Sequence, residues 1–290
     1  MTGCVAGKDE LREAVSEARR EGRTVGLVPT MGALHEGHLS LVRTARERAG
    51  FVIVSIFVNP TQFAPSEDYE RYPRRLEADL ELLGAQGVAL VFAPDVAAMY
   101  PEGPAVSVDP GPLAHRWEGE LRPAHFAGVA TIVTKLLGIV RPDAVFLGEK
   151  DYQQLVIVER LALDLELAAE VVGCPIVRDT DGLALSSRNA YLSADQRRVG
   201  LSLPAALAAA RGALAAGETS GALLEARMRD AARAHGGDAL ELDYAAVVDP
   251  KTLEPLSTVD REARALIAGW VGSTRLLDNC ELAVATGGVA

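Results

Sequence analysis

The stretch "TVGLVPTMGALHEGHLSLVRTARERAGFVIVSIFV", Thr24 to Val58, decides the fold class. It opens on "TVGLVPT", an apolar run that is typical of a buried strand. "HEGHLSLVRTARERAG" then has the pattern of a helix that ends at Gly50. "FVIVSIFV" follows as a β-branched apolar run of strand length. A strand, a helix and a second strand in this order predict part of a parallel sheet.

The same alternation continues toward the C-terminus. Helical patterns cover residues 76–87, 125–140 and 151–165, and strand-like runs cover 88–94 and 143–149, with a further strand inside 167–177. Strand alternating with helix from Thr24 to about Arg178 predicts a Rossmann-like parallel sheet with helices on both faces. We assign residues 1–178 to this α/β domain.

Beyond about Thr180 the pattern changes. Two Ala-rich helical segments are expected, at roughly Ser193–Ala216 and Ser220–His235. Three strand-like runs follow them, "LDYAAVVD", "ARALIAGWV" and "TRLLDNCELA". Helices followed by strands predict a smaller C-terminal α+β domain, residues 179–290.

Composition limits the classes of function. The chain has 290 residues and a net charge of −11, which argues against a general nucleic-acid binder but leaves room for a local basic pocket. Its three scattered cysteines form no CxxC pair and favour a reducing compartment. The first twenty residues are charged and helix-like, and the apolar runs are shorter than a membrane span. We expect a soluble cytoplasmic protein with no nucleic-acid or membrane partner.

Polar clusters follow three of the expected strands. "PTMGALHEGH" follows the first, "NPTQFAPSEDYERYPR" the second and "GEKDYQQ" a later one. Ligands of open parallel sheets bind outside the carboxyl ends of the strands. Three polar loops at such ends are hard to explain by folding alone, so we expect a ligand site there.

His35 and His38 lie in the first of these loops. A zinc protease helix needs its two histidines at i and i+4, whereas these are at i and i+3 and no third ligand is evident, so no metal site is predicted. Residues at i and i+3 share a helix face, and a helix start directs free N–H groups at an anion. Surface decoration is the alternative for a generic pair, but at a strand-to-helix turn we favour contact with phosphate. Gly37 leaves space for a base or ribose.

Lys150 lies at another strand-to-helix transition, in "LGEKDYQQL", where a cation can meet a triphosphate. Gln153 and Gln154 follow in the helix. An ordinary helix start with Asp151 as the cap is the alternative, and both roles can coexist.

Two further loops carry polar groups. Ser186, Ser187 and Arg188 in "DGLALSSRN" make a plausible phosphate clamp, although Ser-rich loops that cap helices are common. Asn59 and Gln62 in "VNPTQF" offer uncharged hydrogen bonding suited to a small hydroxy acid. Turn formation by Asn-Pro explains Asn59 but not Gln62.

These four motifs, in this order and spacing, resemble the pantothenate synthetase (pantoate–β-alanine ligase) family. The resemblance runs over nearly all of the N-terminal domain and into the start of the second. More widely, the His35-Glu36-Gly37-His38 element is similar to the HxGH signature of the HIGH-motif nucleotidylyltransferases, which include class I aminoacyl-tRNA synthetases.

The resemblance implies an ATP-dependent, AMP-forming ligase that uses Mg²⁺ and acts as a homodimer. Pantoate would react with ATP to give pantoyl adenylate and pyrophosphate, and β-alanine would then displace AMP to give pantothenate. The N-terminal domain would bind nucleotide and pantoate, and the C-terminal domain would act as a lid.

The resemblance also implies site residues. Those with a catalytic role would be His38, His35, Lys150 and Arg188. Those at the ATP site would be Met31, Gly32, Ala33, Leu34, His35, Glu36, Gly37, His38, Gly148, Glu149, Lys150, Asp151, Val177, Leu185, Ser186, Ser187 and Arg188. Gln62 and Gln154 would bind pantoate, and Gln62 would also border β-alanine.

Three positions depart from the family pattern: Ala64 after "QF", Ala124 in "RPAHF" and Leu147 before Gly148. None removes a functional group. Two other functions stay open on the residues: a different adenylyl-transferring enzyme, which Gln62 and Gln154 argue against, and a non-catalytic nucleotide-binding module.

Overall fold

The computed structural model describes residues 2–65 and 67–283. The chain divides into two compact units. Unit 1 comprises Met1–Glu149 and Gln153–Pro175, and unit 2 comprises Lys150–Tyr152 and Ile176–Ala290. The three residues Lys150–Tyr152 therefore group with unit 2, although unit 1 flanks them on both sides in the sequence.

Unit 1 is built on a six-stranded parallel sheet with the strand order β1-β4-β3-β2-β5-β6. Its strands are β1 (Gly3–Val5), β2 (Val25–Thr30), β3 (Phe51–Ile56), β4 (Leu90–Phe92), β5 (Ala144–Gly148) and β6 (Glu170–Cys174). The order reverses at β2, which has β3 on one side and β5 on the other. That reversal is where open α/β sheets bind their ligands.

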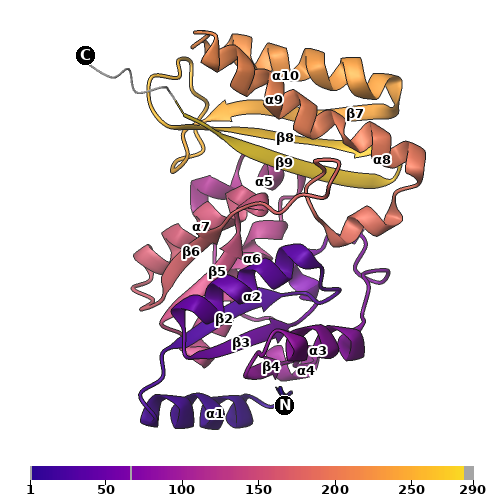
Figure 1. The fold of residues 1–290 in the computed structure, drawn as a ribbon. Helices are drawn as coiled ribbons and strands as arrows, with labels where there is room; N and C mark the ends of the chain where they lie inside the picture. Colours follow the sequence, from indigo (N-terminus) through magenta and orange to yellow (C-terminus); the bar gives the residue numbers. More distant parts are fainter. Residues whose placement is uncertain (1, 66, 284–290) are drawn as a thin grey trace. The chain divides into compact units, whose positions relative to one another are not determined.

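Helices cover both faces of this sheet (Figure 1). The unit contains α1 (Lys8–Arg20), α2 (Glu36–Arg48), α3 (Leu76–Ala85), α4 (Val96–Met99), α5 (Glu118–Leu121), α6 (His125–Val140) and, from its second residue, α7 (Tyr152–Asp164), with the 3₁₀ turns η1 (Pro60–Gln62) and η2 (Gly111–Ala114). The turn η3 (Glu149–Asp151) begins in unit 1, and its last two residues belong to unit 2. Leu39 and Val42 of α2 and Leu83 of α3 share one core layer with Val54 and Phe146 of the strands. Burying these apolar side chains between helix and sheet stabilises the unit.

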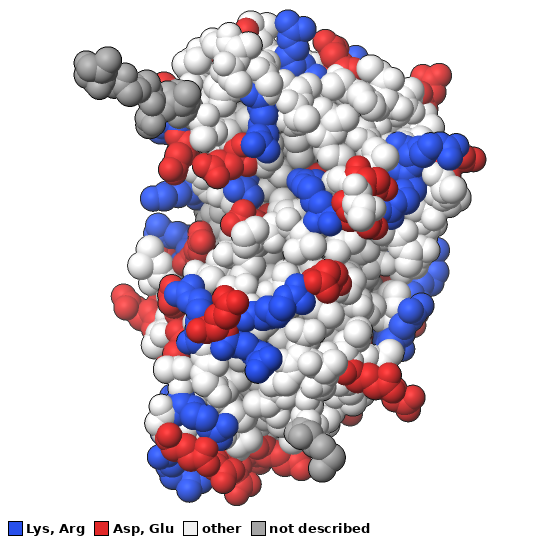
Figure 2. Space-filling model, viewed as in Figure 1, with Lys and Arg blue, Asp and Glu red and all other residues white. Residues whose placement is uncertain are grey.

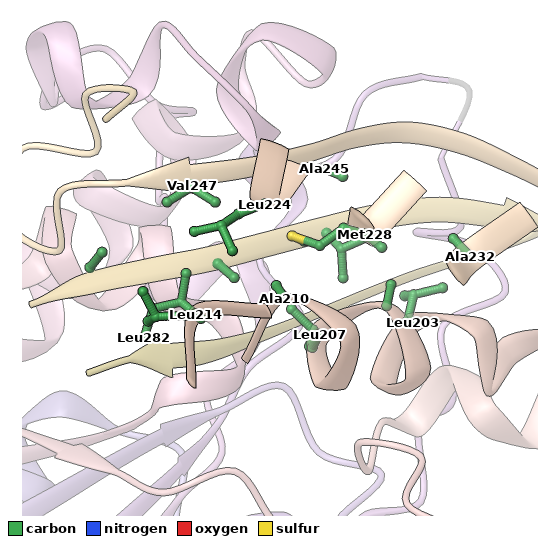
Figure 3. Close-up of a cluster of buried hydrophobic side chains, with 14 of the residues drawn as sticks. Leu203, Leu207, Ala210, Leu214, Leu224, Met228, Ala232, Ala245, Val247 and Leu282 are labelled. Atoms are coloured by element: carbon green, nitrogen blue, oxygen red, sulfur yellow. The ribbon is translucent and has the colours of Figure 1, made fainter. Parts of the chain in front are cut away.

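Unit 2 has a three-stranded antiparallel sheet, β7-β8-β9. Its elements are η4 (Ser187–Tyr191), α8 (Ala194–Gly200), α9 (Ser202–Ala215), α10 (Gly221–Gly236), η5 (Gly237–Ala239), β7 (Leu240–Val248), β8 (Ala263–Val271) and β9 (Thr274–Leu282). Helices α9 and α10 lie side by side on one face of the sheet (Figure 1). Their apolar sides supply Leu207 and Met228 to a core that also takes Ala245 and Val247 from β7 (Figure 3).

The predicted fold class is confirmed: a Rossmann-like parallel sheet with helices on both faces, plus a smaller C-terminal α+β part. Two details of the sequence prediction were wrong. The segment expected as one helix, Ser193–Ala216, is two helices separated at Leu201, because Pro204 lacks an N–H and its ring opposes a helix that continues from the preceding turn. The helix-like prediction for the first twenty residues is confirmed over Lys8–Arg20 but was wrong for Gly3–Val5, which form the edge strand β1, too short to show a period.

The surface is charged but mixed. On the face drawn in Figure 2, Lys and Arg side chains lie interspersed with Asp and Glu. Together with the net charge of −11, this mixture gives no support to a role in general nucleic-acid binding. None of the helices in the described part of the chain has the length and hydropathy that a bilayer crossing requires.

Candidate active site

The loop between β2 and α2 has a constrained backbone. Gly32 and Ala33 both have positive φ, +81° and +51°. The buried Asp79 carboxylate of α3 accepts the N–H groups of Ala33, at 2.9 Å, and Leu34, at 2.8 Å. Burial raises the pKa of Asp79, while these two backbone hydrogen bonds act in the opposite direction. Asp79 therefore holds the loop that leads to the histidine pair.

His35 and His38 form the start of α2. The Nδ1 of His35, the N-cap residue, accepts the N–H of Gly37 at 3.1 Å, and the Nδ1 of His38 accepts the N–H of His35 at 3.3 Å. The two ring centroids are 4.1 Å apart. An acceptor Nδ1 carries no proton, so each neutral ring has its proton on Nε2. Two imidazole N–H donors and the positive end of a helix thus occur together at the carboxyl end of β2.

At the carboxyl end of β3, a buried network orients the amide of Gln62. The side-chain nitrogen of Asn59 donates to the Gly128 carbonyl at 3.1 Å, and the side-chain oxygen of Asn59 accepts the N–H of Thr61. This orientation means that the Asn59 nitrogen also donates to Gln62 Oε1, at 3.1 Å. The Tyr100 hydroxyl donates to the Asn59 oxygen at 2.9 Å, which agrees with the same orientation. Gln62 is consequently turned so that its Nε2, 3.2 Å from Met31 Sδ, is the donor that remains for a ligand.

Sequence analysis did not single out the side chains behind Gln62. His125 Nδ1 donates to the Gln62 carbonyl at 2.9 Å, and burial, helped by the Arg122 charge, lowers the pKa of His125 to about 4. Arg122 in turn binds both oxygens of Glu67, at 2.6 and 2.8 Å. Burial alone would raise the pKa of Glu67, but the hydrogen bond and charge of Arg122 hold it below its ordinary value. The "RPAHF" segment was the available signal, since it carries both Arg122 and His125.

The two glutamines at the start of α7 differ in their surroundings. Gln153 is 4% exposed and is fully used in the fold, because it accepts from Glu118 N–H and donates to the carbonyls of Leu113 and Arg116. Gln154, one of the two predicted pantoate ligands, is only partly buried. Successive helix residues point about 100° apart, which explains how one can be structural and the next accessible.

Most of the remaining predicted residues belong to unit 2; Gly148 and Glu149, at the end of β5 and the start of η3, belong to unit 1. Lys150 forms an ion pair with Asp151 at 3.7 Å, and Asn279 donates to its carbonyl at 2.8 Å. Val177 and Leu185 lie opposite each other, joined by a backbone hydrogen bond of 3.0 Å. Ser186 caps η4 by accepting the N–H of Arg188 at 3.3 Å, and Ser187 lies in the same turn.

The predicted site residues thus fall into two groups. Unit 1 carries Met31 to His38, Gln62, Gly148, Glu149 and Gln154, and unit 2 carries Lys150, Asp151, Val177 and Leu185 to Arg188. Within unit 1, the loop before α2 and Gln62 are brought into contact through Met31. The ligand roles of all these residues stay predictions.

Comparison with known proteins decides the family. A family model described as pantoate-beta-alanine ligase matches residues 4–281. The chain belongs to the pantoate–β-alanine ligase family. The resemblance read from the four motifs, and the prediction of an enzyme of this type, are confirmed.

Relatives of this ligase match it over nearly their full length. The pantothenate synthetase of Salinispora arenicola is 54% identical over 288 residues, which is 98% of this chain and 99% of that protein. The crystal structure of pantothenate synthetase from Thermus thermophilus has a TM-score of 0.92 at 48% identity, covering 97% of this chain and 100% of that one. The pantoate-beta-alanine ligase of Francisella tularensis, solved in complex with beta-gamma ATP and β-alanine, has a TM-score of 0.77 at 31% identity and covers 97% of both chains.

Proposed function

We propose that this ligase joins pantoate to β-alanine in two steps. The pantoate carboxylate attacks the α-phosphorus of ATP, which gives pantoyl adenylate and releases pyrophosphate. The β-alanine amine then attacks the acyl carbon and expels AMP, which leaves pantothenate. The relative solved with a nucleotide and β-alanine supports these two as substrates, and the choice of pantoate rests on the family.

The contact of 3.2 Å between Gln62 Nε2 and Met31 Sδ carries the proposal. Because Asn59 fixes the Gln62 amide with its nitrogen outward, Gln62 suits the carboxylate or hydroxyl oxygens of pantoate. Met31 opens the loop that ends at His35. A carboxylate held by Gln62 would therefore lie beside the proposed phosphate site, and such alignment of two substrates is most of what this reaction needs.

The histidine pair would act on the phosphates. Attack at the α-phosphorus builds negative charge on phosphate oxygens, and the Nε2–H groups of His35 and His38 with the start of α2 are preorganised donors for it. Donors held in place by the capping hydrogen bonds need no reorganisation during the reaction. We assign the larger role to His38.

Unit 2 would supply the cations. Lys150 and Arg188 are proposed to bind phosphate oxygens, with Ser186 and Ser187 beside Arg188. Gly148, Glu149, Asp151, Val177 and Leu185 would complete the nucleotide site. Closure of the C-terminal part as a lid would exclude water, which otherwise hydrolyses the mixed anhydride.

Mg²⁺ would arrive with ATP rather than in a protein cage. Within the residues that the structure describes, no group of three or more His, Cys, Asp and Glu side chains could hold a metal ion. Mg²⁺ commonly binds substrate phosphates with few protein ligands, so binding of MgATP does not require such a group of side chains. Asp79 is a poor candidate ligand, since both its oxygens accept backbone N–H groups. The ion would neutralise charge on the triphosphate.

We also propose that the ligase works as a homodimer in the cytoplasm. The dimer rests on the family resemblance alone. The compartment rests on Cys4, Cys174 and Cys280, which are free thiols.

Isotope exchange tests the two-step order. Labelled pyrophosphate should enter ATP when pantoate is present and β-alanine is absent. A nucleotide-binding module would show no exchange. Exchange that required β-alanine would refute the adenylate order but not the ligase assignment, and equal exchange with unrelated carboxylic acids would reopen the choice of another adenylyl-transferring enzyme.

A further inference from the structure

Lys150 is anchored to the C-terminal sheet through its own backbone. The amide nitrogen of Asn279, on β9, donates to the Lys150 carbonyl at 2.8 Å. The Asn279 amide oxygen accepts from Arg264 Nε, on β8, at 2.8 Å. A guanidinium can only donate and a carbonyl can only accept, so the two partners fix the orientation of the amide between them.

Arg264 also reaches the second residue after Lys150. Its guanidinium carbon lies 4.1 Å from the centroid of the Tyr152 ring, and the Tyr152 hydroxyl donates to the Pro250 carbonyl at 3.1 Å. Asn279 and Arg264 are 2% and 8% exposed. Hydrogen bonds and cation–π contacts that are this well shielded from water are stronger than exposed ones.

The segment of β9 that carries Asn279 is itself held firmly. The neighbouring Asp278, 3% exposed, binds Arg178 through both oxygens, at 2.6 and 2.9 Å, and also accepts the N–H of Asn279 at 2.7 Å. A bidentate ion pair to a buried carboxylate is a geometrically specific contact. Asn279, which binds the Lys150 carbonyl, is therefore held in place by buried contacts within unit 2.

We infer that Asn279, held by Arg264, is a positioning residue that sets where the Lys150 ammonium meets the nucleotide phosphates. The inference rests on the phosphate role proposed for Lys150. The contacts with Asn279, Arg264 and Pro250 also explain why Lys150–Tyr152 group with unit 2 while the residues on either side group with unit 1. Asn279 acts through Lys150 and has no contact of its own with the substrate in this assignment.

The test compares ATP use by single and double variants of the full-length ligase. Asn279→Ala should raise the KM for ATP, or the Kd for ATP by calorimetry, between about 10-fold and 100-fold, the scale of a misplaced binding group. The KM for pantoate should not change. In a Lys150→Ala background, Asn279→Ala should cause no further loss of ATP affinity, since two residues that act through one contact are not additive.

Two further variants separate positioning from loss of stability. Leu276→Ala, on the same strand, removes core packing from unit 2 and should lower the melting temperature without raising the KM for ATP. Arg264→Lys keeps the charge but loses the directed Nε donor, so it should reproduce the effect of Asn279→Ala in the same direction, and it serves if Asn279→Ala fails to fold.

Several outcomes would overturn the inference. The ATP losses of Asn279→Ala and Lys150→Ala could multiply in the double variant, the KM for pantoate could rise together with that for ATP, or Leu276→Ala could have the same effect as Asn279→Ala. If Lys150→Ala itself left ATP binding unchanged, its proposed role on the phosphates would fall as well. A strong effect of Lys150→Ala with none from Asn279→Ala would refute the positioning role alone.

Discussion

Asn59→Asp should reverse the amide that Gln62 offers to pantoate. The substitution replaces the side-chain donor nitrogen of Asn59 with an oxygen of nearly the same size. That oxygen would face Gln62 Oε1 across 3.1 Å, so the Gln62 amide would turn to bring its nitrogen inward. The group directed toward Met31 and the pantoate site would then be an oxygen, which cannot donate to a carboxylate.

The expected loss follows from the hydrogen bond that disappears. A hydrogen bond to a charged group contributes about 1.5–3 kcal/mol, and about 1.4 kcal/mol corresponds to a tenfold change in affinity. The KM for pantoate should therefore rise about 10- to 100-fold. We expect a value near the upper end, because the Gln62 oxygen would then face an oxygen of pantoate. The KM for ATP should stay near that of the parent ligase. The Gly128 carbonyl also loses its donor and the new carboxylate lies at a buried position, so the free energy of unfolding should fall by more than the ~1–3 kcal/mol of one lost hydrogen bond.

Steady-state kinetics with each substrate varied in turn measures this, at a temperature well below the melting transition of the variant. Tyr100→Phe is the matched control: it removes the hydroxyl that donates to the Asn59 oxygen but leaves the Asn59 nitrogen facing Gln62. It should change the KM for pantoate little. An unchanged KM for pantoate in Asn59→Asp, or an equal rise in Tyr100→Phe, would refute the argument from amide orientation.

Three other perturbations have defined outcomes. His38→Ala should fold normally but lower kcat by ~10²-fold, the scale for the loss of one hydrogen-bond donor to the transition state. Near-normal turnover would refute the role of His38 as a donor to the phosphates. Gly32→Ala should destabilise the ligase and raise the KM for ATP, because its φ is +81° and the new Cβ would lie 3.0 Å from Asp79 Oδ2. Gly22→Ala is the control, since Gly22 has a φ of +74° but open space around it, so this variant measures the backbone cost alone. Equal effects of the two substitutions would exclude a role for the contact with Asp79. His125 has a folded-state pKa of about 4, below its ordinary 6.5, so its contribution to stability is present above about pH 6.5 and is lost as pH falls toward 4. The drop in melting temperature between pH 7.5 and 5 should shrink in His125→Asn, and an unchanged drop would contradict the assignment.

The sequence by itself determined the fold class and the candidate side chains. Strand and helix periods are local, so the alternation from Thr24 to Arg178 predicted the parallel sheet, and the polar loops were expected at strand ends for the same reason. The capping relation between His35 and His38 is also local, because it joins residues three apart. The family resemblance then assigned roles to side chains that spacing alone had left open between structural and functional readings.

Only the tertiary structure decided which groups hold those side chains and in what orientation. Gly128, which sets the Asn59 amide, is 69 residues away from it; Asp79 is 46 residues from the Ala33 N–H that it binds; and Asn279 is 129 residues from Lys150. A buried hydrogen bond has no period in the sequence, since any polar residue that the fold brings within about 3 Å can be the partner. From its position in the sequence, Lys150 was predicted to belong to the N-terminal domain. It groups with unit 2 because Asn279 of β9 binds its carbonyl and Arg264 of β8 packs on the ring of the nearby Tyr152.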